Sequence, residues 1–152
     1  STGCDGRLKD LVALNRPVGS LDDLTNWVSN SVTQAYTFDF QNYRDSFMNV
    51  KSNFTEEGWK SFYKGLEDAK LIQSVVDNKY VATAVENGTT TLVSQGVDEN
   101  GVYSWTFQMP MIVTFQHGAK NTSQNLMVTV IVVRENQLKN PRGIGIARII
   151  SQ

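Results

Sequence analysis

Residues 102–116 read VYSWTFQMPMIVTFQ, and this stretch decides the fold because every second side chain in it is apolar. The apolar set consists of Tyr103, Trp105, Phe107, Met109, Met111, Val113 and Phe115. Successive side chains of a β-strand point to opposite faces, so the pattern predicts one long strand with an apolar face and a mostly polar face. Pro110 lies in mid-run without an N–H to donate, which predicts a bend, a bulge or a free edge there.

The apolar face of this strand needs a cover, and three stretches in the first half of the chain have the helical spacing to supply it. The first is predicted over 21–36, with Ser20 as its N-cap. A second, shorter helix follows Asp39, which can cap it. A third begins after Thr55 and is expected to reach about Lys70, where LIQSVV either continues it or turns into the sheet.

From residue 79 onward the apolar period changes from 3.6 to 2, which indicates strands. The predicted strands are 80–86, 90–97, 102–116, 126–134 and 143–150. Asn87-Gly88 predicts a two-residue hairpin between the first two of them. The stretch 117–124 is polar and is predicted to be a loop, whereas 126–134 is apolar on both faces and is predicted to be covered on both sides.

Helices followed by an antiparallel meander predict an α+β fold, with three N-terminal helices packed on one face of a strongly curved antiparallel sheet. This is the layout of the cone-shaped, nuclear-transport-factor-like (NTF2-like) folds. Residues 1–19 have no clean period and are predicted to form an extended N-terminal arm, and 20–152 a single domain. A length of 152 residues suits one domain with one core.

Composition excludes several classes of protein. A net charge of −1 argues against nucleic-acid binding, which usually needs a basic surface. A lone cysteine, Cys4, cannot form an internal disulfide. No stretch is apolar over the roughly 18 residues that a membrane span needs. The chain begins with Ser instead of Met, which suits a fragment whose targeting segment lies upstream.

The residues that most often carry chemistry do not form a reactive group in this sequence. His117, the one histidine, ends the long strand beside a glycine and is predicted to be a polar surface residue. One His and one Cys far apart do not offer a metal site. The acidic pairs at the starts of the first and third helices are explained by the helix dipole. We therefore predict no catalytic residue, no metal and no cofactor, and favour a binding or scaffold role.

A scaffold acts through its surface, so exposed aromatic and arginine side chains are the candidates for protein contacts. We expect contact patches on the exposed part of the first helix, on the segment 36–44 and on the sheet edge. The candidate residues are Trp27, Tyr36, Phe38, Tyr43 and Arg44. Trp59 and Trp105 are instead expected in the core.

Several segments, in this order and spacing, resemble the DotI/IcmL family, whose relatives on conjugative plasmids are called TraM. The segments are NWVSNSVTQAYTFDFQNYR, FTEEGWKSF, QMPMIVTF, QNLMVTVIVVR and NPRGIGIARI, and the resemblance runs from about Leu14 to Ile150. It implies a component of a type IVB secretion or conjugation machine in the bacterial inner membrane. Such members look like bitopic proteins with a short cytoplasmic N-terminus, one transmembrane helix and a periplasmic domain.

This chain would then be the periplasmic domain, joined to the membrane only through an upstream helix that it does not contain. The resemblance also implies a fold similar to the assembly factor at position eight of the VirB-type machines. The resemblance implies no catalytic residues. It suggests self-association into a homo-oligomer and association with other inner-membrane subunits, and it leaves effector secretion and plasmid conjugation both open.

Two hypotheses follow. The first is a non-enzymatic assembly domain whose surface patches contact other subunits. The alternative is a small-molecule-binding or enzymatic domain of the cone-shaped class, which needs an open cavity with polar groups inside. The two differ in whether His117 or any carboxylate faces a cavity between the helices and the sheet.

Overall fold

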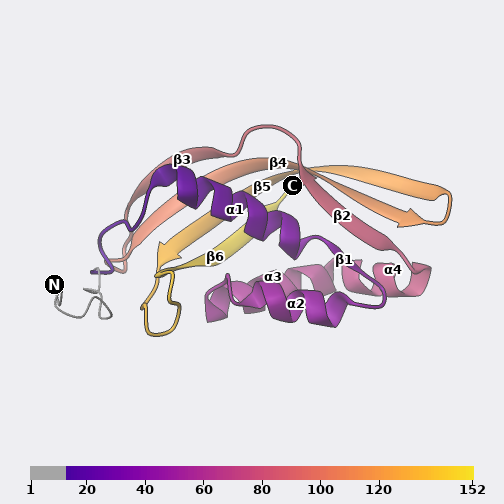
Figure 1. Cartoon of the computed structure of the whole chain (residues 1–152), viewed down its shortest axis with the longest axis horizontal. Helices are drawn as coiled ribbons and strands as arrows, with labels where there is room; N and C mark the ends of the chain where they lie inside the picture. Colours follow the sequence, from indigo (N-terminus) through magenta and orange to yellow (C-terminus); the bar gives the residue numbers. More distant parts are fainter. Residues whose placement is uncertain (1–12) are drawn as a thin grey trace, which may run out of the picture.

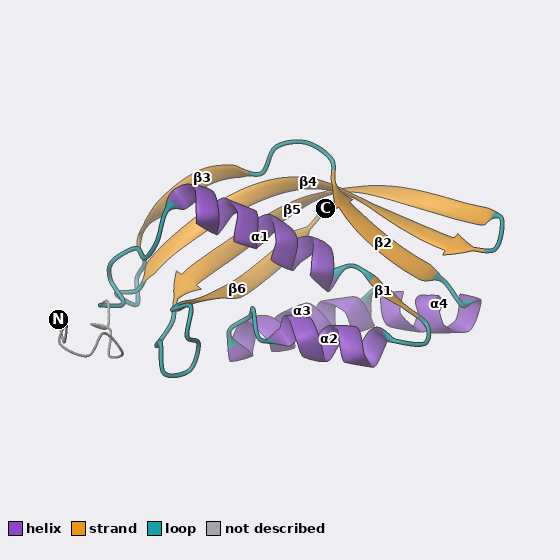
Figure 2. Ribbon diagram, viewed as in Figure 1, coloured by secondary structure: helices purple, strands orange, loops and turns teal. Residues whose placement is uncertain are grey.

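The computed structural model describes residues 13–152, which form an arched antiparallel sheet with helices beneath it (Figures 1 and 2). The helices are α1 Leu21–Ala35, α2 Tyr43–Lys51, α3 Glu56–Asp68 and α4 Leu71–Asn78. The strands are β1 Phe38–Asp39, β2 Val81–Glu86, β3 Thr91–Val97, β4 Tyr103–His117, β5 Lys120–Arg134 and β6 Ile144–Ser151. The predicted α+β fold, with helices on one face of a curved sheet, is confirmed. Cys4 and residues 1–12 of the predicted arm lie outside the described residues.

Two of the predicted helix caps form as expected. The side chain of Ser20 accepts a hydrogen bond from the N–H of Asp23 at 3.1 Å, at the start of α1. The side chain of Thr55 accepts one from the N–H of Gly58 at 3.0 Å, at the start of α3. Each bond satisfies a backbone donor that has no partner inside the helix.

The second helix begins later than Asp39. The Asp39 carboxylate accepts hydrogen bonds from the N–H groups of Gln41, at 2.9 Å, and Asn42, at 2.7 Å. It therefore closes a turn ahead of α2, and Asn42 occupies the N-cap position without a side-chain bond.

LIQSVV lies in a separate fourth helix, α4. It neither continues the third helix nor turns directly into the sheet, the two alternatives that the sequence left open. Lys70 and Lys79, on either side of α4, have φ angles of 58° and 53°. These left-handed conformations end α3 and α4 respectively, because an α-helix does not continue through such a residue.

The Asn87-Gly88 hairpin is not formed. β2 and β3 do not pair with each other, and both pair antiparallel with the same side of β4. A two-residue hairpin of the type that favours Asn-Gly needs a positive φ at both residues. Here only Gly88 has one, at 132°, and the N–H of Asn87 donates to the carbonyl of Pro110 at 2.8 Å instead.

On the side of β4 that faces β2 and β3, Pro110 lies where the pairing partner changes from one of these strands to the other. β2 pairs with β4 from Met111 onward, and β3 pairs with it up to Gln108. The missing donor therefore falls in the gap between two neighbouring strands. The prediction of a free edge or bulge at Pro110 is wrong, because β4 is central and its register with β5 is continuous through this residue.

The polar stretch 117–124 is mostly strand and not a loop. β4 runs to His117 and β5 starts at Lys120, so Gly118 and Ala119 make the turn of a long hairpin. β5 also has one covered face and not two, since Met127 on its convex side is 43% exposed. The helices cover only the concave face, and the convex face is open (Figure 2).

The core lies between that concave face and the helices. Alternate β4 side chains from Trp105 to Val113 are buried against the sides of α1 and α3, as the alternation predicted. Trp59 is only half-buried and packs its ring on Phe47 and Phe54. No helix among the described residues is long and apolar enough to cross a bilayer.

A buried arginine fastens the start of the described chain to the sheet. Arg134, 2% exposed at the end of β5, donates to the carbonyls of Gly143 at 2.8 Å, Ala13 at 2.7 Å and Arg16 at 3.0 Å. The N–H of Tyr103 donates to the carbonyl of Leu14 at 2.8 Å. Residues 13–16 are thereby held against the first residues of β4 and the last of β5.

Helix α3 approaches β6 at one glycine. A Cβ at Gly58 would overlap the carbonyl oxygen of Ile146, whereas one at Gly65 on the same helix would meet nothing within 4 Å. We predict that Gly58→Ala lowers the free energy of unfolding by roughly 1–3 kcal/mol through overpacking. Gly65→Ala, the matched control, should raise it by roughly 0.5–1 kcal/mol. Urea denaturation of both variants checks this, and equal effects would contradict the close contact.

Candidate functional site

The five residues predicted to contact partners lie in different surroundings. Tyr36 and Phe38 are 5% and 3% exposed, so their side chains pack inside the domain. This corrects the prediction for these two, which assumed that the segment 36–44 is exposed throughout. Trp27 and Tyr43 are half-buried and Arg44 is exposed. These three remain candidates for direct contact.

Tyr43 and Arg44 begin α2 and form one small surface. The Tyr43 ring packs edge-on against buried Phe47, with centroids 6.1 Å apart. Above it, the guanidinium carbon of Arg44 lies 4.7 Å from the Tyr43 ring centroid. A cation over an aromatic face is held by the negative charge density of the ring. The pair therefore presents an ordered cationic and aromatic patch on a packed helix.

Trp27 on α1 has a similar arrangement with a residue that the sequence analysis did not single out. The guanidinium carbon of Arg142, in the β5–β6 connection, lies 5.9 Å from the Trp27 ring centroid. The two side chains line a shallow groove of about 140 Å³, together with Asp23 and Leu24 of α1. Arg142 was missed because an arginine in a turn, 115 positions after Trp27, gives no local signal.

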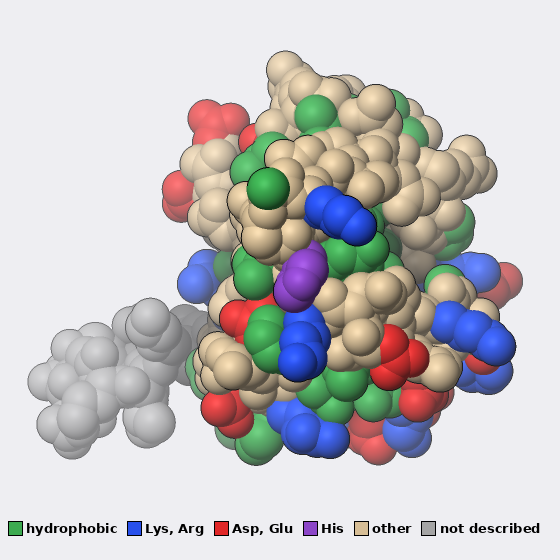
Figure 3. All heavy atoms as spheres, turned by 90° about the vertical axis from the view of Figure 1, so that its right-hand side faces the viewer, with side chains coloured by type: hydrophobic (Ala, Val, Ile, Leu, Met, Phe, Trp, Pro, Cys, Tyr) green, Lys and Arg blue, Asp and Glu red, His purple; other side chains and the backbone are tan. Residues whose placement is uncertain are grey.

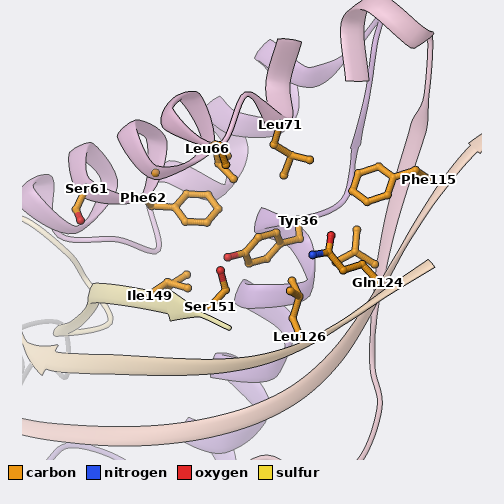
Figure 4. A pocket seen from close by; sticks show the side chains of 13 residues that line it. Tyr36, Ser61, Phe62, Leu66, Leu71, Phe115, Gln124, Leu126, Ile149 and Ser151 are labelled. Carbon is orange, nitrogen blue, oxygen red and sulfur yellow. The ribbon is translucent and has the colours of Figure 1, made fainter. Parts of the chain in front are cut away.

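A cavity of about 320 Å³ opens between α3, α4 and the concave face of the sheet (Figure 4). Its apolar lining comes from Tyr36, Phe62, Leu66, Leu71, Phe115, Leu126 and Ile149, among others. Ser61, Gln124 and Ser151 add neutral polar groups. Apolar side chains therefore fill the space under the buried part of β4 and leave a cavity beside Phe115.

Tyr36 is the one ionisable residue that lines this cavity within 13–152. Burial raises the pKa of its hydroxyl, and a hydrogen bond with the Ser151 side chain partly opposes the rise. Figure 4 shows the two hydroxyl groups turned toward each other. A neutral phenol with a raised pKa is a hydrogen-bonding group at neutral pH and a poor base.

His117 and the carboxylates lie elsewhere. The His117 ring is exposed and its Nδ1 lies 3.2 Å from the carbonyl oxygen of Lys79, at the far end of β4. No carboxylate from the described residues lines the cavity. The same part of the chain contains no group of three His, Cys, Asp or Glu side chains that could hold a metal ion. The cavity therefore offers a bound group apolar contacts and hydrogen bonds with uncharged side chains.

The Tyr36 hydroxyl gives a pH-dependent prediction. Its folded-state pKa is above the unfolded value near 10, so the stability linked to its proton is complete below pH 10 and falls as the pH rises further. Tyr36→Phe removes this titration. The free energy of unfolding of the variant, relative to the unsubstituted protein, should therefore be constant between about pH 7 and 9 and increase above pH 10. Urea denaturation over this range measures it, and a difference independent of pH would contradict the burial argument.

Comparison with known families and structures places these features in context. The family model described as "Type-IV b secretion system, inner-membrane complex component", of the DotI/IcmL type, matches residues 1–152. The periplasmic domain of DotI is 34% identical, with a TM-score of 0.85, over 90% of this chain and 97% of that one. A periplasmic fragment of TraM is 25% identical, with a TM-score of 0.81, over 89% and 98%.

A more distant structure shares the fold alone. CagV, a VirB8 homolog from Helicobacter pylori strain 26695, is 12% identical, with a TM-score of 0.66, over 85% of this chain and 95% of its own. Comparison with curated proteins gave no significant match. The family model matches the whole chain, and the helices of the domain lie on a curled sheet as they do in VirB8-type periplasmic domains. The chain therefore belongs to the DotI/IcmL family of type IVB secretion components.

Proposed function

We propose that this chain is a non-enzymatic assembly domain that works in the periplasm, within the inner-membrane complex of a type IVB secretion or conjugation machine. The family match over residues 1–152 carries the proposal. The similarity to the periplasmic domains of DotI and TraM supports the location. The neutral lining of the cavity supports a role without chemistry, because acid–base catalysis needs a positioned group that titrates near the working pH.

The patch of Tyr43 and Arg44 is the contact surface that we propose. Tyrosine and arginine dominate the residues that carry binding energy at protein interfaces. A contact residue that is already ordered before binding loses less conformational entropy. Tyr43 is fixed by Phe47 below it, and Arg44 is positioned over Tyr43. Trp27 with Arg142 is a second surface of the same kind.

We further propose that the domain self-associates and that a transmembrane helix upstream of this chain anchors it. The segment 13–16, bound by Arg134 and Tyr103, is the part of the described chain nearest to any such helix. A membrane anchor would then be connected to the sheet covalently, through the polypeptide, and also through these hydrogen bonds.

Location is tested on the full-length product in its own bacterium. Membrane fractionation followed by protease treatment of spheroplasts should find the protein in the membrane fraction, with this domain digested. A soluble product that resists the protease inside the cell would overturn the periplasmic assignment.

The contact surface is tested by charge reversal. Arg44→Glu in the full-length protein should lower the yield of other machine subunits that co-purify from detergent-solubilised membranes by about tenfold or more, since a hot-spot contact is worth roughly 2 kcal/mol or more. Arg148→Glu makes the same charge change at an exposed residue of β6 and should leave the yield within about twofold. The melting temperature of each isolated domain should stay within about 2 °C of the unsubstituted one. An unchanged yield with Arg44→Glu would exclude this patch.

A further inference from the structure

The sequence contains Asn-Gly at two places, residues 87–88 and 100–101. An asparagine before a glycine can modify itself, because the backbone nitrogen of the next residue can attack the side-chain amide carbon and glycine has no Cβ to hinder the approach. In both places the preceding residue is a glutamate, so the two pairs have the same local sequence, Glu-Asn-Gly. A large difference in their reactivity within the folded protein would therefore come from the structure.

The pair at 100–101 is held in a hydrogen-bonded turn between β3 and β4. The N–H of Gly101, whose nitrogen would make the attack, donates to the carbonyl of Asp98 at 3.0 Å. The Asp98 carboxylate accepts hydrogen bonds from the N–H groups of Asn100, at 2.8 Å, and Val102, at 3.0 Å. The N–H of Asp98 donates to the carbonyl of Val102 at 2.8 Å. Cyclisation at Asn100 would require this turn to open.

The pair at 87–88 lies in the connection between β2 and β3, which forms the top of the molecule in Figures 1 and 3. Residues 86–89 are exposed. No hydrogen bond joins the N–H of Gly88 to another residue of the described range 13–152. The attacking nitrogen at this pair is therefore not held by the protein, unlike that of Gly101.

Glycine is required at position 88 by the local packing. Its φ of 132° lies in a region that residues with a Cβ rarely adopt, and a Cβ would lie 2.8 Å from Cγ of Pro110. The N–H of Asn87 donates to the carbonyl of the same proline at 2.8 Å. The fold thereby keeps, directly after Asn87, the residue that hinders cyclisation least.

We propose that Asn87 is a site of spontaneous modification, at which the folded protein converts asparagine into aspartate and isoaspartate. The nitrogen of Gly88 forms a bond with Cγ of Asn87, and the bond from Cγ to Nδ2 breaks. Nδ2 leaves as ammonia, with the proton that the Gly88 nitrogen loses, and a succinimide ring remains. Water then opens the ring at either of its carbonyl carbons, so water is the only other reactant. This inference is independent of the proposed function.

The two products change the domain differently. Opening at Cγ restores the original backbone and leaves an aspartate, which adds one negative charge to a chain whose net charge is −1. Opening at the main-chain carbonyl carbon gives isoaspartate, whose backbone contains an additional carbon atom. That atom lies between the N–H that bonds to Pro110 and the glycine that packs on its ring. The isoaspartyl form therefore cannot keep both contacts in their present geometry.

The modification is measured on the folded chain at mildly alkaline pH, by digestion and mass spectrometry of the two Asn-Gly peptides over time. Asn87 should be converted at least tenfold faster than Asn100, since Asn100 must first lose the hydrogen bonds of its turn. Both products should form at Asn87, and a protein isoaspartyl methyltransferase should label the isoaspartyl one. Rates that differ by less than tenfold, or an Asn87 that stays unmodified, would overturn the proposal.

The unfolded chain is the matched control. In guanidinium chloride both pairs lose their surroundings, and because their local sequences match, the two rates should agree within about threefold. A tenfold difference that persists in the unfolded chain would come from the sequence and would exclude the structural cause.

Two variants test the site and the turn separately. Asn87→Gln keeps an uncharged amide but would have to close a larger ring, so the acidic form of the protein should no longer accumulate. Asp98→Ala removes the carboxylate that bonds to the turn, and should speed the conversion of Asn100 about threefold or more while Asn87 stays within about twofold. An acidic form that still accumulates in the first variant, or an unchanged Asn100 in the second, would contradict the assignment.

Discussion

The apolar concave face of β4 is the constraint on which the rest of this domain depends. Trp105, Phe107, Met109, Met111 and Val113 are all at most 2% exposed. Burying such side chains is worth roughly 1.5–3 kcal/mol each, so a strand with this face is unstable without a cover. α1 and α3 supply the cover, and the closeness of α3 is set by Gly58 against the backbone of β6. The curvature of the sheet and the one-sided placement of the helices follow from that need.

The cover is shorter than the strands. β4 and β5 continue past the helices to His117 and Lys120, where their side chains become polar and exposed. The cavity lies at the boundary between the covered and uncovered parts. The cavity and the exposed end of the hairpin therefore have one cause. β4 and β5 remain paired by backbone hydrogen bonds beyond the last residues that have apolar side chains to bury.

The sequence predicts the features that depend on neighbouring residues and not those that depend on distant ones. The Ser20 and Thr55 caps and the alternation along β4 are local, and all three were predicted. The path after Asn87 was mispredicted because its N–H bonds to Pro110, a contact that no short-range pattern reveals. Residues 120–124 of β5 were mispredicted as part of the loop 117–124 because a polar strand outside the core has no apolar period. Tyr36 was assigned to the surface because sequence alone does not show which aromatic residues the core encloses.

The β4–β5 hairpin connects the point where the described chain enters the domain with the end of the sheet that lies farthest from it. At one end, Tyr103 and Arg134 bind the segment 13–16. From there the two strands pair from Ser104 to His117 without a break in register. Because the backbone hydrogen bonds continue along the whole hairpin, the position of the segment 13–16 fixes the position of the hairpin end as well. An anchor attached upstream of that segment would therefore orient the whole sheet relative to the membrane.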